Sequence, residues 1–189
     1  YECVTYPLSL DKFLFSFEWA VDDIDMDGNI DIALTGWEVD LIEGTSIPAF
    51  NVFFGNGIGE FTEVIIPSDP SYGIAMQIAD IDRDGDRDII KGNMIDDMGE
   101  GESLLNILHN EDVTRETASL FWYENIGANE FVEHLIEHDT GPYQALEVGD
   151  LDGDGDFDIV ANTEEAADLN HEWGRSNQIV YYQNDGSQN

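Results

Sequence analysis

Three nine-residue segments place carboxylates at alternate positions, a spacing suited to binding a hard cation. They read DIDMDGNID (23–31), DIDRDGDRD (80–88) and DLDGDGDFD (150–158), and all three follow the pattern D-x-D-x-D-G-x-x-D. Calcium takes six to eight oxygen ligands, and carboxylates at alternate positions of a tight loop can converge on one point. The glycine at position 6 permits the sharp turn that this requires. Because unscreened carboxylates so close together repel each other, we expect a cation in each loop.

Side-chain ligands are expected at positions 1, 3, 5 and 9 of each loop, and a backbone carbonyl ligand at position 7. The predicted metal residues are Asp23, Asp25, Asp27, Asn29 and Asp31; Asp80, Asp82, Asp84, Asp86 and Asp88; and Asp150, Asp152, Asp154, Asp156 and Asp158. They predict three Ca²⁺ sites, because magnesium resists so many protein ligands. An EF-hand needs a glutamate at position 12, where this chain has Leu34, Lys91 and Ala161. The alternative is that the segments are solvated turns without metal. It is less favoured, because a surface turn has no need of four carboxylates in register.

Short runs rich in Ile, Val and aromatic residues flank each loop and predict strands. One strand precedes each loop, and the ranges are 17–21, 74–79 and 145–148. A second follows it, at 30–34, 87–90 and 157–160, and an aromatic third strand comes later, at 50–54, 119–124 and 178–183. An Asn/Gly turn then leads to a fourth strand in the first two units, at 61–66 and 131–136. Variable segments, including 35–49, separate the second strand from the third.

These units predict a single all-β repeat domain over 1–189, made of three four-stranded antiparallel blades of the propeller type. The expected blades are residues 14–67, residues 72–137, and residues 143–189 together with a strand at 1–7. The segment YECVTYP (1–7) resembles FTEVIIP (61–67), so it is expected to complete the last blade, in cis or from a neighbouring subunit. Three blades are too few for a closed ring. Either the chain is part of a longer protein, or strand exchange joins subunits head to tail into a ring or a fibre.

The segment GDLDGDGDFDIVANT (149–163), followed by IVYYQNDG (179–186), resembles the FG-GAP/VCBS repeat family. That family forms calcium-loop propeller blades in integrin α-subunits and in many secreted bacterial proteins and lectins. The resemblance covers nearly the whole chain, and it implies antiparallel four-stranded blades with calcium between the first and second strands. The chain departs from the family in having three blades and a long insertion at 92–118. The family includes adhesion, carbohydrate-binding and enzyme accessory modules, so the resemblance alone does not assign a function.

The charge of the chain excludes several classes of partner. Its 189 residues include 42 acidic and 6 basic side chains, for a formal net charge of −36. Nucleic acids and anionic membranes both require Lys and Arg, and no apolar run is long enough for membrane insertion. The charge suits cations or a high-salt medium in which self-repulsion is screened. Cys3 is the only cysteine, so no internal disulfide forms, which fits both a secreted protein held by metal and a cytosolic one.

Residues after the second strands are the candidates for binding a further ligand, and they are Trp37, His171, Trp173 and Arg175. They are expected on the face opposite the Asp loops, where binding residues concentrate on loops. A tryptophan ring beside polar side chains can stack on a sugar. Packing of both tryptophans between blades is the alternative.

The favoured function is a calcium-stabilised extracellular or cell-surface module for adhesion, assembly or carbohydrate binding, with a glycan or a partner protein as ligand. The alternative is a propeller-type polysaccharide lyase or an accessory domain of a secreted enzyme, with His171, Arg175 and Tyr143 as its residues. No catalytic motif is present, which favours a protein that is not an enzyme.

Overall fold

A computed structural model of the chain describes residues 13–40, 45–67, 72–95, 118–140, 142–164 and 177–186. These residues form β1 (Phe13–Asp22), β2 (Asp31–Asp40), β3 (Thr45–Gly55), β4 (Phe61–Ile65), β5 (Tyr72–Ala79), β6 (Asp88–Ile95), β7 (Ala118–Asn125), β8 (Phe131–Thr140), β9 (Tyr143–Gly149), β10 (Asp158–Glu164) and β11 (Asn177–Tyr182). The expectation of an all-β chain is confirmed for this part of the sequence. Within it, no helix has the length and hydropathy needed to cross a membrane.

The strands form three antiparallel sheets, and each sheet is a meander in chain order. Sheet 1 contains β1-β2-β3-β4, sheet 2 contains β5-β6-β7-β8, and sheet 3 contains β9-β10-β11. Two sheets therefore have the predicted four strands, and sheet 3 has three among the described residues. The strand predicted at 1–7 to complete sheet 3 lies outside the described residues.

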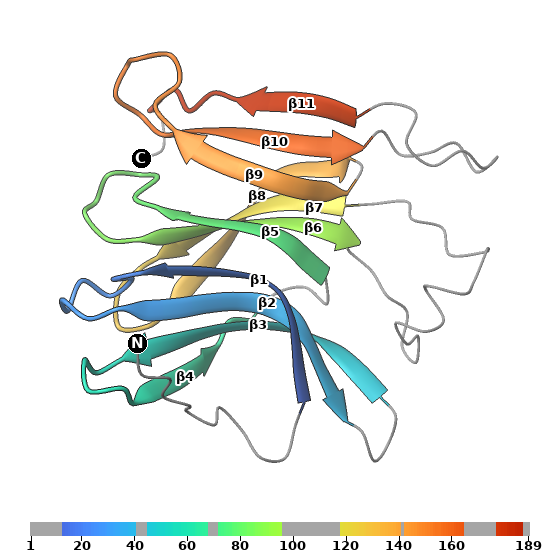
Figure 1. Cartoon of the computed structure of the whole chain (residues 1–189). Helices are drawn as coiled ribbons and strands as arrows, with labels where there is room; N and C mark the ends of the chain where they lie inside the picture. Colours follow the sequence, from blue (N-terminus) through green and yellow to red (C-terminus); the bar gives the residue numbers. More distant parts are fainter. Residues whose placement is uncertain are drawn as a thin grey trace, which may run out of the picture.

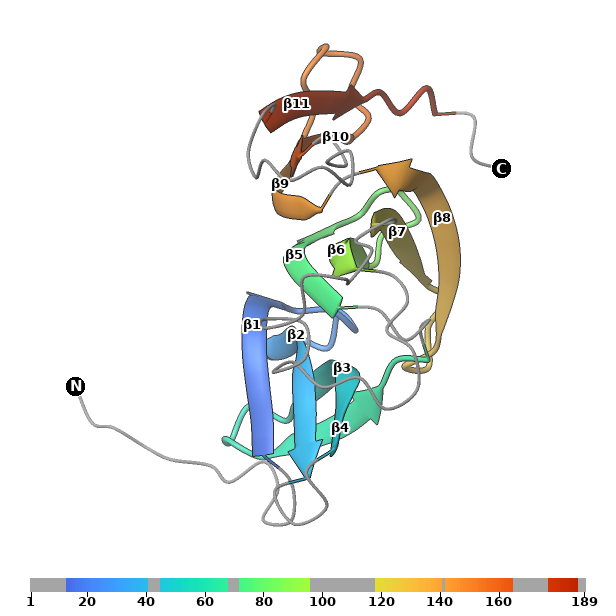
Figure 2. The same cartoon turned by 90° about the vertical axis from the view of Figure 1, so that its right-hand side faces the viewer.

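The sheets stack in chain order, with sheet 2 between the other two (Figure 1). The first strands lie side by side, because β5 contacts β1 on one side and β9 on the other. Figure 2 shows the same succession of sheets from a direction 90° away. The three repeats are therefore neighbours in space as well as in sequence, which is the arrangement of repeat proteins.

The hydrophobic core consists of two layers, one on each side of sheet 2. Successive side chains of a strand point to opposite faces, so neighbouring residues of sheet 2 enter different layers. Ile89 and Tyr123 belong to the layer shared with sheet 1, and Ile90 and Trp122 belong to the layer shared with sheet 3. Because both faces of sheet 2 are buried, β7 carries a continuous apolar run at 120–123 rather than an alternating pattern, whereas β6 buries Lys91 and Asn93 beside Ile89 and Ile90.

The segment 35–49 was expected to be an insertion, and this expectation is wrong for most of it. β2 continues to Asp40 and β3 begins at Thr45, and the two strands pair throughout, for example Trp37 with Pro48. Gly36 and Pro48 hide the strand signal in the sequence. Gly36 is required by packing, since a Cβ at this position would lie 2.2 Å from the carbonyl oxygen of Phe15 in β1.

The three Asp loops are the hairpin connections β1–β2, β5–β6 and β9–β10, and all three lie at the same edge of the stack, on the left in Figure 1. The end of β2 and the start of β3 lie at the opposite edge. Longer segments that join second to third strands, at 96–117 and 165–176, are outside the described residues.

Candidate metal sites

Each Asp loop turns at its sixth residue, where the backbone adopts a left-handed conformation. Gly28, Gly85 and Gly155 have φ values of 91°, 105° and 94°. This region is open to glycine and strained for residues with a Cβ. The glycine therefore lets a short hairpin bring its carboxylates to one side of the turn.

Three carboxylates in each loop place one oxygen each within 4.8 Å of the others. The groups are Asp23, Asp25 and Asp27 in the first loop, Asp80, Asp82 and Asp84 in the second, and Asp150, Asp152 and Asp158 in the third. Positions 1 and 3 contribute in every loop, position 5 in the first two and position 9 in the third. The use of all four predicted side-chain positions by one ion stays a prediction, as does the backbone carbonyl at position 7.

The carboxylate at position 9 fastens each loop to its sheet. Its two oxygens accept hydrogen bonds from two backbone N–H groups, one at position 2 of the loop and one at the end of the third strand or just after it. The donors are Ile24 and Gly55 for Asp31, Ile81 and Asn125 for Asp88, and Leu151 and Asn184 for Asp158, at distances of 2.8–3.0 Å. These carboxylates are at most 1% exposed, so the charge-assisted bonds are screened little by water.

Crowding and partial burial make several loop carboxylates weak acids. Burial, followed by repulsion from neighbouring carboxylates, raises the pKa of Asp25. Burial is also the main cause that raises the pKa of Asp86 to about 7 and that of Asp88 to about 6. Like charges and desolvation both disfavour the ionised form. A bound divalent cation would reverse this tendency by stabilising the carboxylates.

One carboxylate oxygen in the first loop is available to a ligand. Asp23 Oδ1 is buried and has no hydrogen-bond partner among the described residues, while its Oδ2 accepts the N–H of Gly28 at 2.9 Å. A buried carboxylate oxygen without a donor costs free energy. Together with the oxygen-only donor set of the loop, this oxygen fits a hard cation such as calcium.

Side chains at the loop edge also join neighbouring sheets, and the sequence did not predict these contacts. Asn125 Nδ2 of sheet 2 donates to the carbonyl oxygen of Ile24 in the first loop, at 3.0 Å. Asn184 of sheet 3 bonds to Ile81 in the second loop in the same way, at 3.2 Å. The only signal was the recurrence of asparagine in the turns ENIG and QNDG. Ordering of one Asp loop therefore affects the contact with the next sheet.

Two ion pairs also link neighbouring sheets at this edge. Arg87 of sheet 2 pairs with Asp22 of sheet 1 at 3.2 Å, and Arg83 of the second loop pairs with Asp156 of the third. Both arginines are partly exposed, so each pair contributes little to stability by itself.

The other candidate residues do not form a second site in the described structure. Trp37 is 1% exposed, and its ring packs against Phe15 and Phe17 with centroid distances of 6.3 and 4.9 Å. Its burial favours the packing alternative over stacking on a sugar. Tyr143 is fully buried, with its hydroxyl 2.9 Å from that of Tyr182.

The remaining three candidates, His171, Trp173 and Arg175, lie outside the described residues.

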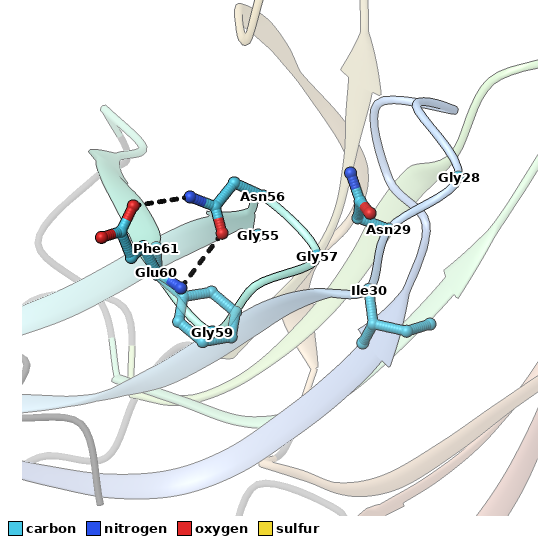
Figure 3. Close-up of a pocket in the computed structure, with 9 residues that line it drawn as sticks. All are labelled: Gly28, Asn29, Ile30, Gly55, Asn56, Gly57, Gly59, Glu60 and Phe61. Carbon is cyan, nitrogen blue, oxygen red and sulfur yellow. Dashed lines mark hydrogen bonds between the residues drawn. The ribbon is translucent and has the colours of Figure 1, made fainter.

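A hollow of about 380 Å³ lies between the first Asp loop and the β3–β4 turn (Figure 3). Two hydrogen bonds hold this turn: Asn56 Nδ2 donates to the Glu60 carboxylate at 2.8 Å, and the Glu60 N–H donates to Asn56 Oδ1 at 3.1 Å. Glycines and backbone form much of the lining, and Asn29 faces the hollow from the loop. The hollow therefore presents no set of acid, base and nucleophile.

Stacked antiparallel sheets, each with the same Asp-rich hairpin between its first two strands, define an all-β repeat protein with candidate metal loops. Residues 23–90 match the family model described as an FG-GAP-like repeat. The match begins at the first carboxylate of the first loop and ends in the strand after the second loop, so recognition of this repeat from the sequence is confirmed. The third loop, at 150–158, has the same pattern beyond the matched segment. No curated protein matches the chain.

Proposed function

We propose that the protein is a calcium-stabilised repeat module of the propeller type that acts outside the cell or at its surface. One observation supports this most strongly: three Asp loops at one edge of the stack each bring three carboxylate oxygens within 4.8 Å. The FG-GAP-like match over residues 23–90 supports propeller-type blades. The module would serve adhesion, assembly or carbohydrate binding.

In each loop, the carboxylates at positions 1, 3, 5 and 9 would hold the ion. Bound calcium supplies two positive charges, which offset repulsion among the loop carboxylates. Ile24 and Ile81 belong to these loops and are buried in the layers between sheets. A loop ordered by calcium therefore keeps an apolar side chain in place between two sheets, so metal binding in the loops stabilises the stack.

Thermal unfolding at increasing calcium concentration tests this proposal, because an ion that binds the folded state raises the melting temperature. The informative variant replaces the carboxylate at position 3 of every loop: Asp25→Asn, Asp82→Asn and Asp152→Asn. The matched control removes one exposed carboxylate outside each Asp loop: Glu60→Gln in the β3–β4 turn, where glutamine keeps an acceptor for Asn56, Glu130→Gln in the β7–β8 turn, and Glu147→Gln in β9. We expect calcium to raise the melting temperature of the wild type and the control, and to have little effect on the loop variant.

Magnesium at the same concentration is expected to stabilise the protein less than calcium. A melting temperature that is independent of calcium, or an equal response in the loop variant and the control, would contradict the proposal.

The extracellular partner is proposed to be a glycan or a protein. A glycan array probed in calcium and again in chelator tests the carbohydrate alternative, since a partner bound by the ordered stack should be lost on chelation. Glycan binding that is unchanged by chelator would show that it does not depend on calcium in the Asp loops.

A further inference from the structure

Each contact between sheets joins two different faces. We call the face toward the next sheet in the chain the forward face, and the face toward the preceding sheet the backward face. Val52 and Phe50 lie on the forward face of sheet 1, and Ile89 and Tyr123 lie on the backward face of sheet 2. The contact of sheet 2 with sheet 3 repeats this arrangement. A forward face therefore meets a backward face in both contacts.

Among the described strands, the two ends of the stack leave one face of each kind without a neighbouring sheet. On the backward face of sheet 1, Trp19, Val21 and Ile65 are 63%, 62% and 64% exposed. Trp19 lies four residues before its Asp loop, as Met76 does in sheet 2, and Met76 is 3% exposed in the layer between sheets. The position is thus buried where a preceding sheet is present and exposed where none is.

The forward face of sheet 3 shows the complementary pattern. Ile179 and Tyr181 in β11 are 80% and 45% exposed. They lie five and three residues before Asn184, whose N–H bonds the position-9 carboxylate of sheet 3. The residues five and three before Asn125, which has this role in sheet 2, are Leu120 and Trp122, and they are 0% and 5% exposed. Leu151, on the same side, is 55% exposed, whereas its counterpart in the second loop, Ile81, is 7% exposed. Exposed apolar patches of this kind mark interaction sites.

We propose that the backward face of sheet 1 docks on the forward face of sheet 3 of a second copy of this chain. The proposal rests on the proposed function, and it names the partner in assembly. A second copy is the fitting occupant because each end carries the half of the contact that the other end lacks. The contact continues the stacking already present between the sheets of one chain. It is heterologous, so it closes into a ring or continues as a fibre.

Three of the polar links found inside the chain have no counterpart at this junction. Gly55 occupies the position of Asn125 and Asn184, so sheet 1 cannot donate the side-chain bond to a loop carbonyl. Ile30 occupies the position of Arg87, and Gly153 that of Arg83, so both ion pairs are also missing. The exposed apolar side chains would therefore be the main contacts across this junction.

Electrostatic repulsion opposes this junction. Three calcium ions would add six positive charges against a formal net charge of −36, so copies would still repel each other. Salt screens such repulsion over a distance of about 10 Å at 0.1 M. Association should consequently strengthen as ionic strength rises, which is the opposite of a contact held by salt bridges.

Sedimentation velocity of the whole chain, in calcium at high ionic strength, tests the proposal. The variants Trp19→Glu and Ile179→Glu each disable one face, and Leu135→Glu, at a 54% exposed position in β8, is the control with the same change in charge. We expect the wild type and the control to associate with rising concentration. Each face variant is expected to associate at least about 30-fold more weakly than the wild type. A mixture of the two face variants should form dimers, because each retains one intact face.

A wild type that stays monomeric at all concentrations would overturn the proposal. So would face variants that associate like the control, or a mixture that stays monomeric. Circular dichroism checks that the variants are folded, and Val21→Glu provides a second disabled backward face. A monomer that still binds calcium in its loops would overturn the docking and leave the proposed function standing.

Discussion

Asp31→Asn tests whether the carboxylate at position 9 holds the fold independently of metal. Asp31 is fully buried, and its two oxygens accept the N–H groups of Ile24 and Gly55, each at 2.8 Å. Asparagine keeps one acceptor and turns an N–H group toward the other donor. The substitution thus removes a charge-assisted bond and leaves a buried N–H without an acceptor, at a cost of about 3–5 kcal/mol. That is a large share of the stability of a domain, typically about 5–15 kcal/mol.

Urea unfolding in chelator, at high ionic strength, measures this loss without any contribution from bound calcium. Asp27→Asn is the matched control, because it removes the same charge from an exposed side chain. Among the described residues, Asp27 accepts hydrogen bonds from Asn29 of its own loop, both at 2.8 Å. We expect Asp27→Asn to lower the free energy of unfolding in chelator by less than about 1 kcal/mol, and to lose most of the calcium-dependent stabilisation of the first loop. Equal losses for the two variants in chelator would refute the separate structural role of position 9.

Three further predictions concern the contacts between sheets and the response to pH. Asn125→Ala removes the bond to the Ile24 carbonyl and leaves that oxygen buried, so the free energy of unfolding in urea should fall by about 1–3 kcal/mol; an unchanged value would contradict the link. Gly92→Ala should destabilise by a similar amount, about 1–3 kcal/mol, because its Cβ would lie 2.6 Å from a buried tyrosine of sheet 3; unchanged urea unfolding would show that this packing is loose. The pKa of Asp86 is raised to about 7 and that of Asp88 to about 6, whereas an Asp in the unfolded chain has a pKa of about 3.9. The folded state therefore binds protons more tightly than the unfolded state. In chelator, the stability they contribute is complete below pH about 4 and is lost as the pH rises through about 6 and 7, so a melting temperature that rises over this range would be inconsistent with these shifts.

The strands could be predicted from the sequence because their signals are local. Each is a short run of Ile, Val and aromatic residues bounded by a turn, and the Asp loops mark the connection between the first two strands of each sheet. The prediction failed at 35–49, where Gly36 and Pro48 interrupt the apolar pattern but the backbone still pairs. Strand pairing with a neighbour overrides local propensity at such positions.

The Asp loops could be predicted as a donor set, but not in their second role. The spacing of Asp23, Asp25 and Asp27 suggested a cation because alternate residues of a tight hairpin face the same side. The bond between Asp31 and Gly55 forms because Gly55, the last residue of the third strand, lies beside the loop. The strand register determines which residue takes that place. The bond from Asn125 to the preceding sheet depends further on how the sheets stack, which no local pattern encodes.

Calcium stoichiometry of the purified chain, measured by isothermal titration calorimetry after complete removal of metal, tests the central claim most directly. Three ions per chain are expected, with two remaining when position 3 of one loop is changed, as in Asp82→Asn. An absence of calcium binding, or a stoichiometry that does not fall when this carboxylate is removed, would contradict the assignment of the Asp loops as calcium sites.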